Sequence, residues 1–192
     1  MIRALYNWTI QLAEHRNAIW ALAFVAFVES SVFPIPPDIL MIPMIVAAPR
    51  RAFWIAGVAT VASVLGGMLG YWIGAAFFDS IGQPVLAFYG KDVLFDQFKT
   101  SYNQWGAWAV LIAGVTPFPY KVITILSGVT GLNLTVFMLA SIVARGIRFF
   151  LVAALLWKFG APIKDFIERR LGLMFSLAMA LLLGGFLAVR YL

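Results

Sequence analysis

The stretch FVESSVFPIPPDILMIPM, residues 27–44, decides how this chain folds. It is strongly apolar, yet it contains three prolines within four positions and two carboxylates, Glu29 and Asp38. Proline lacks a backbone N–H and clashes with the preceding turn, so these prolines should end a helix. Neither apolar half reaches the roughly 20 residues that a membrane-spanning helix needs. We therefore expect a re-entrant helical hairpin over residues 18–48; the alternative is one long kinked helix.

The composition is that of an integral membrane protein. The chain has 192 residues, of which 63% are hydrophobic and 11% charged, and its mean hydropathy is +0.94. Soluble domains carry about 25% charged residues. The net charge of +6 favours contact with anionic lipid over nucleic acid, because no nucleic-acid motif accompanies it. With no cysteine and a single surface histidine, His15, we expect neither a metal nor a cofactor.

A second break resembles the first. The sequence TPFPYK, residues 116–121, interrupts another pair of short apolar runs, which predicts a second re-entrant hairpin over 105–131. A glycine-containing span follows each hairpin, at 52–77 and at 132–158. This order predicts an inverted repeat, with oppositely oriented hairpins and a substrate path near the midplane. The prolines expected to form the two breaks are Pro34, Pro36, Pro37, Pro117 and Pro119.

The remaining segments complete an all-α membrane domain over residues 1–192. Amphipathic patterns predict interfacial helices at 1–17, 84–104 and 162–171, and a last span at 173–191. Gly66, Gly70 and Gly74 recur every four residues and predict a smooth face for close helix packing, which would also permit a homodimer.

The distribution of basic residues predicts the topology. One face of the membrane would carry seven bases, and the positive-inside bias places that face and the N-terminus in the cytoplasm. We therefore expect a cytoplasmic N-terminus; the family resemblance described below implies that the membrane is the bacterial inner membrane. The seven bases are Arg3, Arg16, Arg50, Arg51, Lys164, Arg169 and Arg170.

Five ionisable residues are predicted to lie at membrane depth, and they form the candidate site for a substrate or a proton. A charge at a helix centre costs about 2.5–3.5 kcal/mol on insertion scales, so these groups should pair or face a polar path. Arg145 and Arg148 share a helix face and would suit a phosphate. The alternative is that the charges only hold the fold together. The five residues are Glu29, Asp38, Lys121, Arg145 and Arg148.

Among these five, Glu29 is the leading candidate for a proton site. Burial favours the protonated form of a carboxyl group, whereas a nearby arginine favours the ionised form. The sequence leaves open which of the two effects dominates.

These motifs resemble the DedA family, also called the SNARE-associated or VTT-domain family. The resemblance is carried by ESSVFPIPPD (29–38), by the glycine segment ending in GYWIG (70–74) and by TPFP (116–119) after Gly114, and it covers roughly residues 18–160. It implies two opposed re-entrant hairpins and lipid translocation. Bacterial members are linked to recycling undecaprenyl phosphate or flipping phospholipids and to the proton motive force, and eukaryotic relatives are lipid scramblases.

The resemblance can be carried over residue by residue. Glu29 and Asp38 match the two membrane acids of the family. The second hairpin of the family usually carries one arginine before its proline and one after it. This chain has no base at 114–116 and has Lys121 after the break, so Arg145 and Arg148 on the next span are candidates to replace the missing arginine.

Four functions follow from these observations. The first is a non-enzymatic translocase for a lipid or lipid-phosphate head group, with membrane lipids as partners and protons as a candidate coupling ion. The second is a proton-coupled transporter of small cations or drugs, which Glu29 and Asp38 would bind. A structural membrane-integrity factor is the third. The fourth, an enzyme acting on lipid phosphates, lacks a recognisable nucleophile–base arrangement.

Overall fold

The computed structural model describes residues 17–32, 36–90, 92–116 and 118–160, and all the regular structure in these ranges is helical. The segments expected at 162–171 and 173–191, and all but the last residue of the segment expected at 1–17, lie outside the described residues. The elements are α2 (Ala18–Ser31), α3 (Asp38–Ala47), a 3-10 turn η1 (Pro49–Arg51), α4 (Ala52–Phe77), a π-helical turn η2 (Phe78–Gly82), α5 (Gln83–Tyr89), α6 (Asp92–Val115), α7 (Tyr120–Val129) and α8 (Leu134–Phe159).

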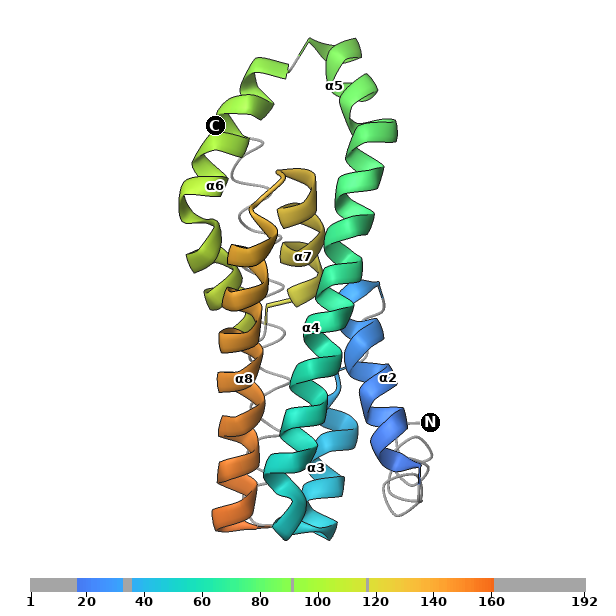
Figure 1. Ribbon diagram of the computed structural model, residues 1–192, viewed down its shortest axis with the longest axis vertical. Helices are drawn as coiled ribbons and strands as arrows, with labels where there is room; N and C mark the ends of the chain where they lie inside the picture. Colours follow the sequence, from blue (N-terminus) through green and yellow to red (C-terminus); the bar gives the residue numbers. More distant parts are fainter. Residues whose placement is uncertain (1–16, 33–35, 91, 117, 161–192) are drawn as a thin grey trace, which may run out of the picture.

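Two long helical stretches frame the molecule. Pro49–Gly82 and Leu134–Phe159 contain 34 and 26 residues and are apolar enough to cross a bilayer, whereas α2, α3 and α7 are shorter apolar helices. Figure 1 shows α2 rising to mid-height and α3 returning toward the end from which α2 started. From the opposite end α6 descends to mid-height and α7 returns. The two breaks therefore meet near the middle of the long helices.

The breaks form where the sequence places the prolines. Helix α2 ends at Ser31, and α3 begins after Pro37, which is its N-cap residue. Pro119 takes an extended conformation (φ −62°, ψ 99°) immediately before α7. Proline favours such positions because its ring fixes φ and it has no N–H to lose. Pro34 and Pro117 lie outside the described residues.

One predicted boundary is wrong. The sequence suggested an amphipathic helix over 84–104 and a new element from Trp105, but α6 runs without interruption through this point. The chain instead breaks at Gly90, whose φ of 62° ends α5 in the left-handed conformation. An isolated glycine inside a helical pattern does not end the helix. Gly106 is such a residue, and a Cβ there would press on the side chain of Leu132.

Glycines bring α4 into close contact with both short helices around it. A Cβ at Gly66 would overlap the carbonyl oxygen of Phe27 in α2, and one at Gly74 would overlap that of Ile125 in α7. At Gly70 the nearest group is the Thr124 side chain. The predicted glycine face of α4 is thus the surface against which α2 and α7 pack within one chain.

The apolar core is divided into two clusters. One is formed by α2, α3, the first half of α4 and the last half of α8, with Met41, Ile45 and Phe149 among its buried members. The other is formed by α6, α7 and the first half of α8, and includes Val110 and Tyr120. The ends of the short helices lie between the clusters, so polar side chains at the breaks are enclosed from two sides.

Candidate functional site

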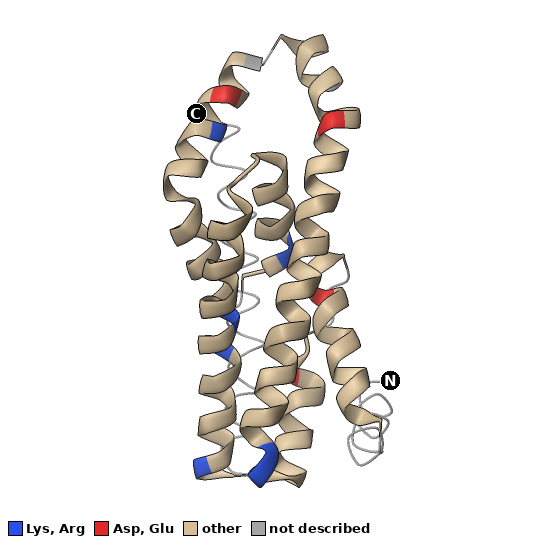
Figure 2. Ribbon diagram, in the orientation of Figure 1, with Lys and Arg blue, Asp and Glu red and all other residues tan. Residues whose placement is uncertain are grey.

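Of the five ionisable residues predicted at membrane depth, three lie near the ends of short helices beside the breaks and two lie in the middle of α8. Figure 2 shows both acidic and basic residues near mid-height of the described helices. Glu29 lies in the last turn of α2, Asp38 is the first residue of α3 and Lys121 lies in the first turn of α7. Arg145 and Arg148 come from the middle of α8, which runs past both breaks. Asp38 lies at the N-terminal end of its helix, where the positive end of the helix dipole favours a carboxylate, whereas Glu29 lies at a C-terminal end, which does not favour one.

Glu29 and Arg145 form the first ion pair, in which the Glu29 side chain is 15% exposed. Arg145 Nη2 lies 2.8 Å from Glu29 Oε2, and the arginine side chain is fully buried. Its Nε donates to Ser63 Oγ in α4 at 2.6 Å. The guanidinium carbon lies 4.8 Å from the ring centroid of Tyr120 and 4.6 Å from that of Phe149. Because the rings belong to different apolar clusters, Arg145 joins the two clusters as well as the two helices.

Asp38 and Arg148 form the second ion pair. Arg148 Nη2 lies 2.9 Å from Asp38 Oδ2, and Arg148 Nη1 donates to the carbonyl oxygen of Thr116 at 3.1 Å. Arg148 is the more accessible arginine, with 14% of its side chain exposed. Asp38 also benefits from the positive end of the α3 dipole. Its other oxygen, Oδ1, is buried and has no hydrogen-bond partner among the described residues.

Lys121 and Thr124 connect the start of α7 to the end of α2. The Thr124 hydroxyl has two carbonyl acceptors in reach, that of Ser30 at 3.1 Å and that of Lys121 in its own helix at 2.9 Å. Lys121 Nζ donates to the Val32 carbonyl at 3.3 Å. The bonds to Ser30 and Val32 satisfy carbonyls that have no helical partner. Among the described residues Lys121 has no carboxylate partner. It is the base that is free of an ion pair in this cluster.

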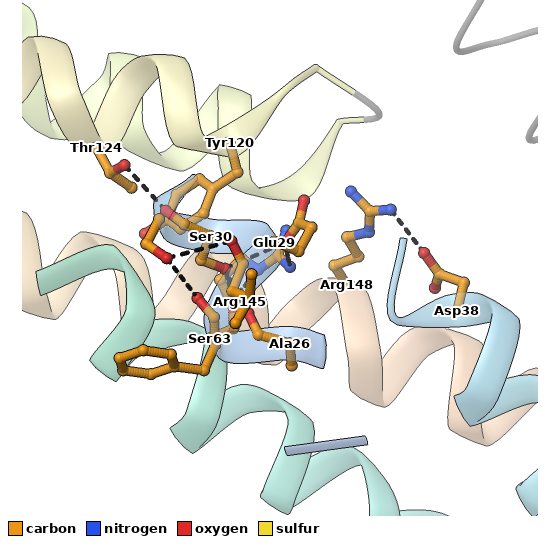
Figure 3. Close-up of polar contacts among 12 residues, drawn as sticks. Ala26, Glu29, Ser30, Asp38, Ser63, Tyr120, Thr124, Arg145 and Arg148 are labelled. Carbon is orange, nitrogen blue, oxygen red and sulfur yellow. Dashed lines mark hydrogen bonds and ion pairs between the residues drawn. The ribbon is translucent and has the colours of Figure 1, made fainter. Parts of the chain in front are cut away.

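Two serines complete the site, and sequence reasoning missed both of them. Ser30 Oγ and Ser63 Oγ lie 2.6 Å apart and are fully buried beside Glu29 and Arg145 (Figure 3). A signal was available in the sequence. Ser63 precedes Gly67 by four residues and Gly70 by seven, so it is a polar residue on the face by which α4 packs.

The structure gives each arginine its own carboxylate. Although Arg145 and Arg148 are three residues apart on α8, they bind acids from two different helices. A phosphate would therefore have to replace Asp38 at Arg148, instead of filling a vacant site between two arginines. Three bases and two acids leave a formal charge of +1 in this cluster. In the described ranges no group of three His, Cys, Asp or Glu residues could hold a metal ion.

Comparison with known proteins identifies a family. The sequence profile of the VTT domain matches residues 35–158. An uncharacterised protein of Haemophilus influenzae is 37% identical over 168 residues, which cover 85% of this chain and 87% of that protein. An uncharacterised homologue from Histophilus somni is 39% identical with the same coverage. No solved structure matches.

Proposed function

This chain belongs to the VTT-domain family, and from that premise we propose that it is a membrane transporter which carries a lipid or lipid-phosphate head group across the bilayer, with proton coupling through its buried carboxylates. The family is membrane-associated and transporter-like, and this chain has two helices long and apolar enough to span a membrane. Large apolar side chains on the outside of the helices also fit a lipid-facing surface. They include Trp20, Trp54, Val61, Trp72 and Leu151, each more than half exposed.

We propose that α2–α3 and α6–α7 are re-entrant hairpins that enter from opposite sides of the membrane as an inverted repeat. In Figure 1 the two pairs approach mid-height from opposite ends. Irregular backbone at membrane depth requires protein or water around it. Here the carbonyls of Ser30, Val32 and Thr116 at the breaks accept hydrogen bonds from Thr124, Lys121 and Arg148.

We infer the orientation of the chain in the membrane from the basic residues at one end of the molecule. The end of the molecule where α4 begins and α8 finishes carries only bases among the described residues, namely Arg50, Arg51 and Lys158. The positive-inside bias places this end in the cytoplasm. The relatives come from bacteria, so the membrane would be the bacterial inner membrane.

The observation that carries the proposal is that the two acids of the first break pair with arginines of α8, beside Lys121 of the second break, which has no ion pair among the described residues. Arg148 and Lys121 are the bases that a head group could reach, because Arg145 is fully buried. The N-termini of α3 and α7 follow the two breaks and add positive dipole ends, which favour an anion. Acyl tails would remain in the bilayer, so only the polar head needs a protected path.

The ion pairs also suggest how a proton would take part. A phosphate that binds Arg148 takes the partner of Asp38, which is 4% exposed. A buried carboxylate without a partner is costly, and protonation removes that cost. In this scheme head-group binding and proton uptake occur together, and release of the head group returns the carboxylate to Arg148.

A cation transporter is the second candidate, and one atom favours it. Asp38 Oδ1 is buried and has no hydrogen-bond partner within the described ranges, so it is an acceptor that a small cation could use. A cation substrate would depend chiefly on the two carboxylates. A phosphate head group would depend chiefly on Arg148 and Lys121.

The test is head-group translocation in proteoliposomes. Labelled undecaprenyl phosphate and phosphatidylethanolamine are compared, with and without a pH gradient. Wild type is compared with Glu29→Gln and Arg148→Ala at matched amounts of folded protein. Flipping that requires both residues supports the proposal, and gradient dependence separates coupled transport from scrambling. If well-folded protein flips neither lipid, the proposal of lipid translocation is replaced by a cation substrate or a structural role.

A further inference from the structure

Four side chains form a closed ring of hydrogen bonds beside the first break. Arg145 Nε donates to Ser63 Oγ at 2.6 Å, and Ser63 Oγ lies 2.6 Å from Ser30 Oγ. Ser30 Oγ lies 3.1 Å from Glu29 Oε2, which in turn accepts from Arg145 Nη2 at 2.8 Å. The ring joins α2, α4 and α8, as Figure 3 shows.

The chemistry of the end groups fixes the direction of this ring. A guanidinium only donates and an ionised carboxylate only accepts. Ser63 therefore accepts from Arg145, and its own proton points to Ser30. The reverse direction would leave the buried Ser63 proton without an acceptor among the described residues. Each hydroxyl thus accepts a hydrogen bond from its neighbour on the arginine side and donates one to its neighbour on the Glu29 side.

Ser30 has a choice that Ser63 does not have. Its single proton has two acceptors in reach, Glu29 Oε2 at 3.1 Å and the Ala26 carbonyl at 3.0 Å. An ionised Glu29 attracts this proton more strongly than a carbonyl does, because hydrogen bonds to charged acceptors are stronger. After Glu29 is protonated, the hydroxyl can turn to Ala26 without losing a bond.

We propose that Ser30 is a positioning residue that sets the proton affinity of Glu29, by donating to the ionised carboxylate and turning to the Ala26 carbonyl when that carboxylate is protonated. The inference deepens the proposed function and rests on it for the use made of the proton. Removal of the hydroxyl takes a donor from the ionised form alone. Glu29 should then bind its proton at higher pH.

The unperturbed pKa values of arginine, lysine and tyrosine side chains lie at about 10 or above, far from that of a carboxyl group. Asp38 is the other carboxylate of the cluster and must be distinguished from Glu29 in any measurement. The groups that face the cluster are Arg145 and Arg148 on α8, Tyr120 and Lys121 on α7, and Asp38 on α3.

Infrared difference spectroscopy measures the proton on Glu29 directly. The purified protein in lipid is titrated from about pH 4 to pH 9. The protonated-carboxyl band is assigned to Glu29 by its loss in Glu29→Gln and its persistence in Asp38→Asn. Ser30→Ala should raise the midpoint of this band by about one pH unit or more, a tenfold change in proton affinity. Ser30→Cys, which keeps a weaker donor, should give a smaller upward shift.

The neighbouring serine supplies the matched control. Ser31 is equally buried on the same helix, but its hydroxyl bonds only to the carbonyls of Phe27 and Val28, each at 3.2 Å. Ser31→Ala should leave the midpoint unchanged. An unchanged midpoint in Ser30→Ala and Ser30→Cys overturns the inference, as does the absence of a Glu29 band at every pH. If Ser30→Ala shifts the midpoint but the wild-type protein flips no lipid, the inference about Ser30 is supported and the proposed lipid translocation is rejected.

Discussion

Arg148 and Asp38 are separated by 110 residues in the sequence, yet Arg148 Nη2 lies 2.9 Å from Asp38 Oδ2. The same guanidinium donates to the Thr116 carbonyl, so one side chain holds the start of α3 and the end of α6 together. In each pair one partner is partly exposed, Arg148 by 14% and Glu29 by 15%, while Arg145 is fully buried. Of the two arginines, Arg148 is therefore the one that an anionic head group can reach.

Replacement of Arg148 tests this role. We expect Arg148→Ala to slow the flipping of a phosphate-bearing lipid by about tenfold or more, because loss of one partner from a buried charge pair costs about 2–5 kcal/mol. Arg148→Lys should recover little activity, since lysine cannot bind Asp38 and Thr116 with a planar fork. Lys158→Ala, at the far end of α8, is the control. Full activity in Arg148→Ala would contradict an anionic substrate.

Substitution of Lys121 should weaken substrate binding without destabilising the fold. It contributes one 3.3 Å bond to Val32 and no ion pair among the described residues, so Lys121→Ala should change thermal stability little. The same substitution should raise the lipid-phosphate concentration needed for half-maximal flipping. Added salt should reduce the difference in this concentration between wild type and variant. Lys99→Ala on α6 provides a comparison. A large loss of folded protein in Lys121→Ala would instead indicate a structural lysine.

The ion pair formed by Glu29 and Arg145 should respond differently to single and double substitution. Glu29→Met or Arg145→Met alone leaves an uncompensated buried charge, and we expect a cost of about 3–5 kcal/mol. The double variant should regain much of the stability, measured as thermal unfolding in detergent, but no transport. Equal instability of the single and double variants would show that the aromatic contacts of Arg145, and not its charge, hold the fold.

The glycine face gives a prediction that does not depend on function. Gly66→Ala would force a Cβ into the carbonyl of Phe27, so we expect a loss of about 1–3 kcal/mol in stability. Gly57→Ala lies on the same helix with no atom within 4 Å of the added Cβ. It should gain about 0.5–1 kcal/mol from the better helix propensity of alanine. Comparable melting temperatures for the two variants would argue against close packing of α4 on α2.

Thr124 provides a test of the junction between the breaks. Thr124→Val keeps the shape but removes the donor to the Ser30 carbonyl, and we expect a loss of about 0.5–1.5 kcal/mol together with faster amide exchange at the end of α2. Thr130→Val is the matched control. The Thr130 hydroxyl bonds only within its own segment, to Leu126 and Ser127. Identical exchange in both variants would contradict a junction held by Thr124.

The sequence was informative wherever a local rule applied. Proline chemistry predicted both breaks, and the spacing of Gly66, Gly70 and Gly74 predicted a packing face. The same rules failed at Trp105, where a change of amphipathic pattern within one continuous helix was interpreted as a boundary. A change in which face is apolar does not break backbone hydrogen bonds. The helix continues because no residue there interrupts them.

The sequence by itself predicted five ionisable residues at membrane depth, with Arg145 and Arg148 on the span after the second break, and it predicted that such charges require partners. Only the tertiary structure decided the partners: Glu29 with Arg145, Asp38 with Arg148, and Ser63 between α2 and α8. Helical spacing relates residues within one helix, whereas a pair across helices depends on how α8 is rotated and placed against both breaks. That placement is set by the close approach of Gly114 in α6 to Ala144 in α8 and by the packing of Arg145 between the rings of Tyr120 and Phe149, which join segments distant in the sequence.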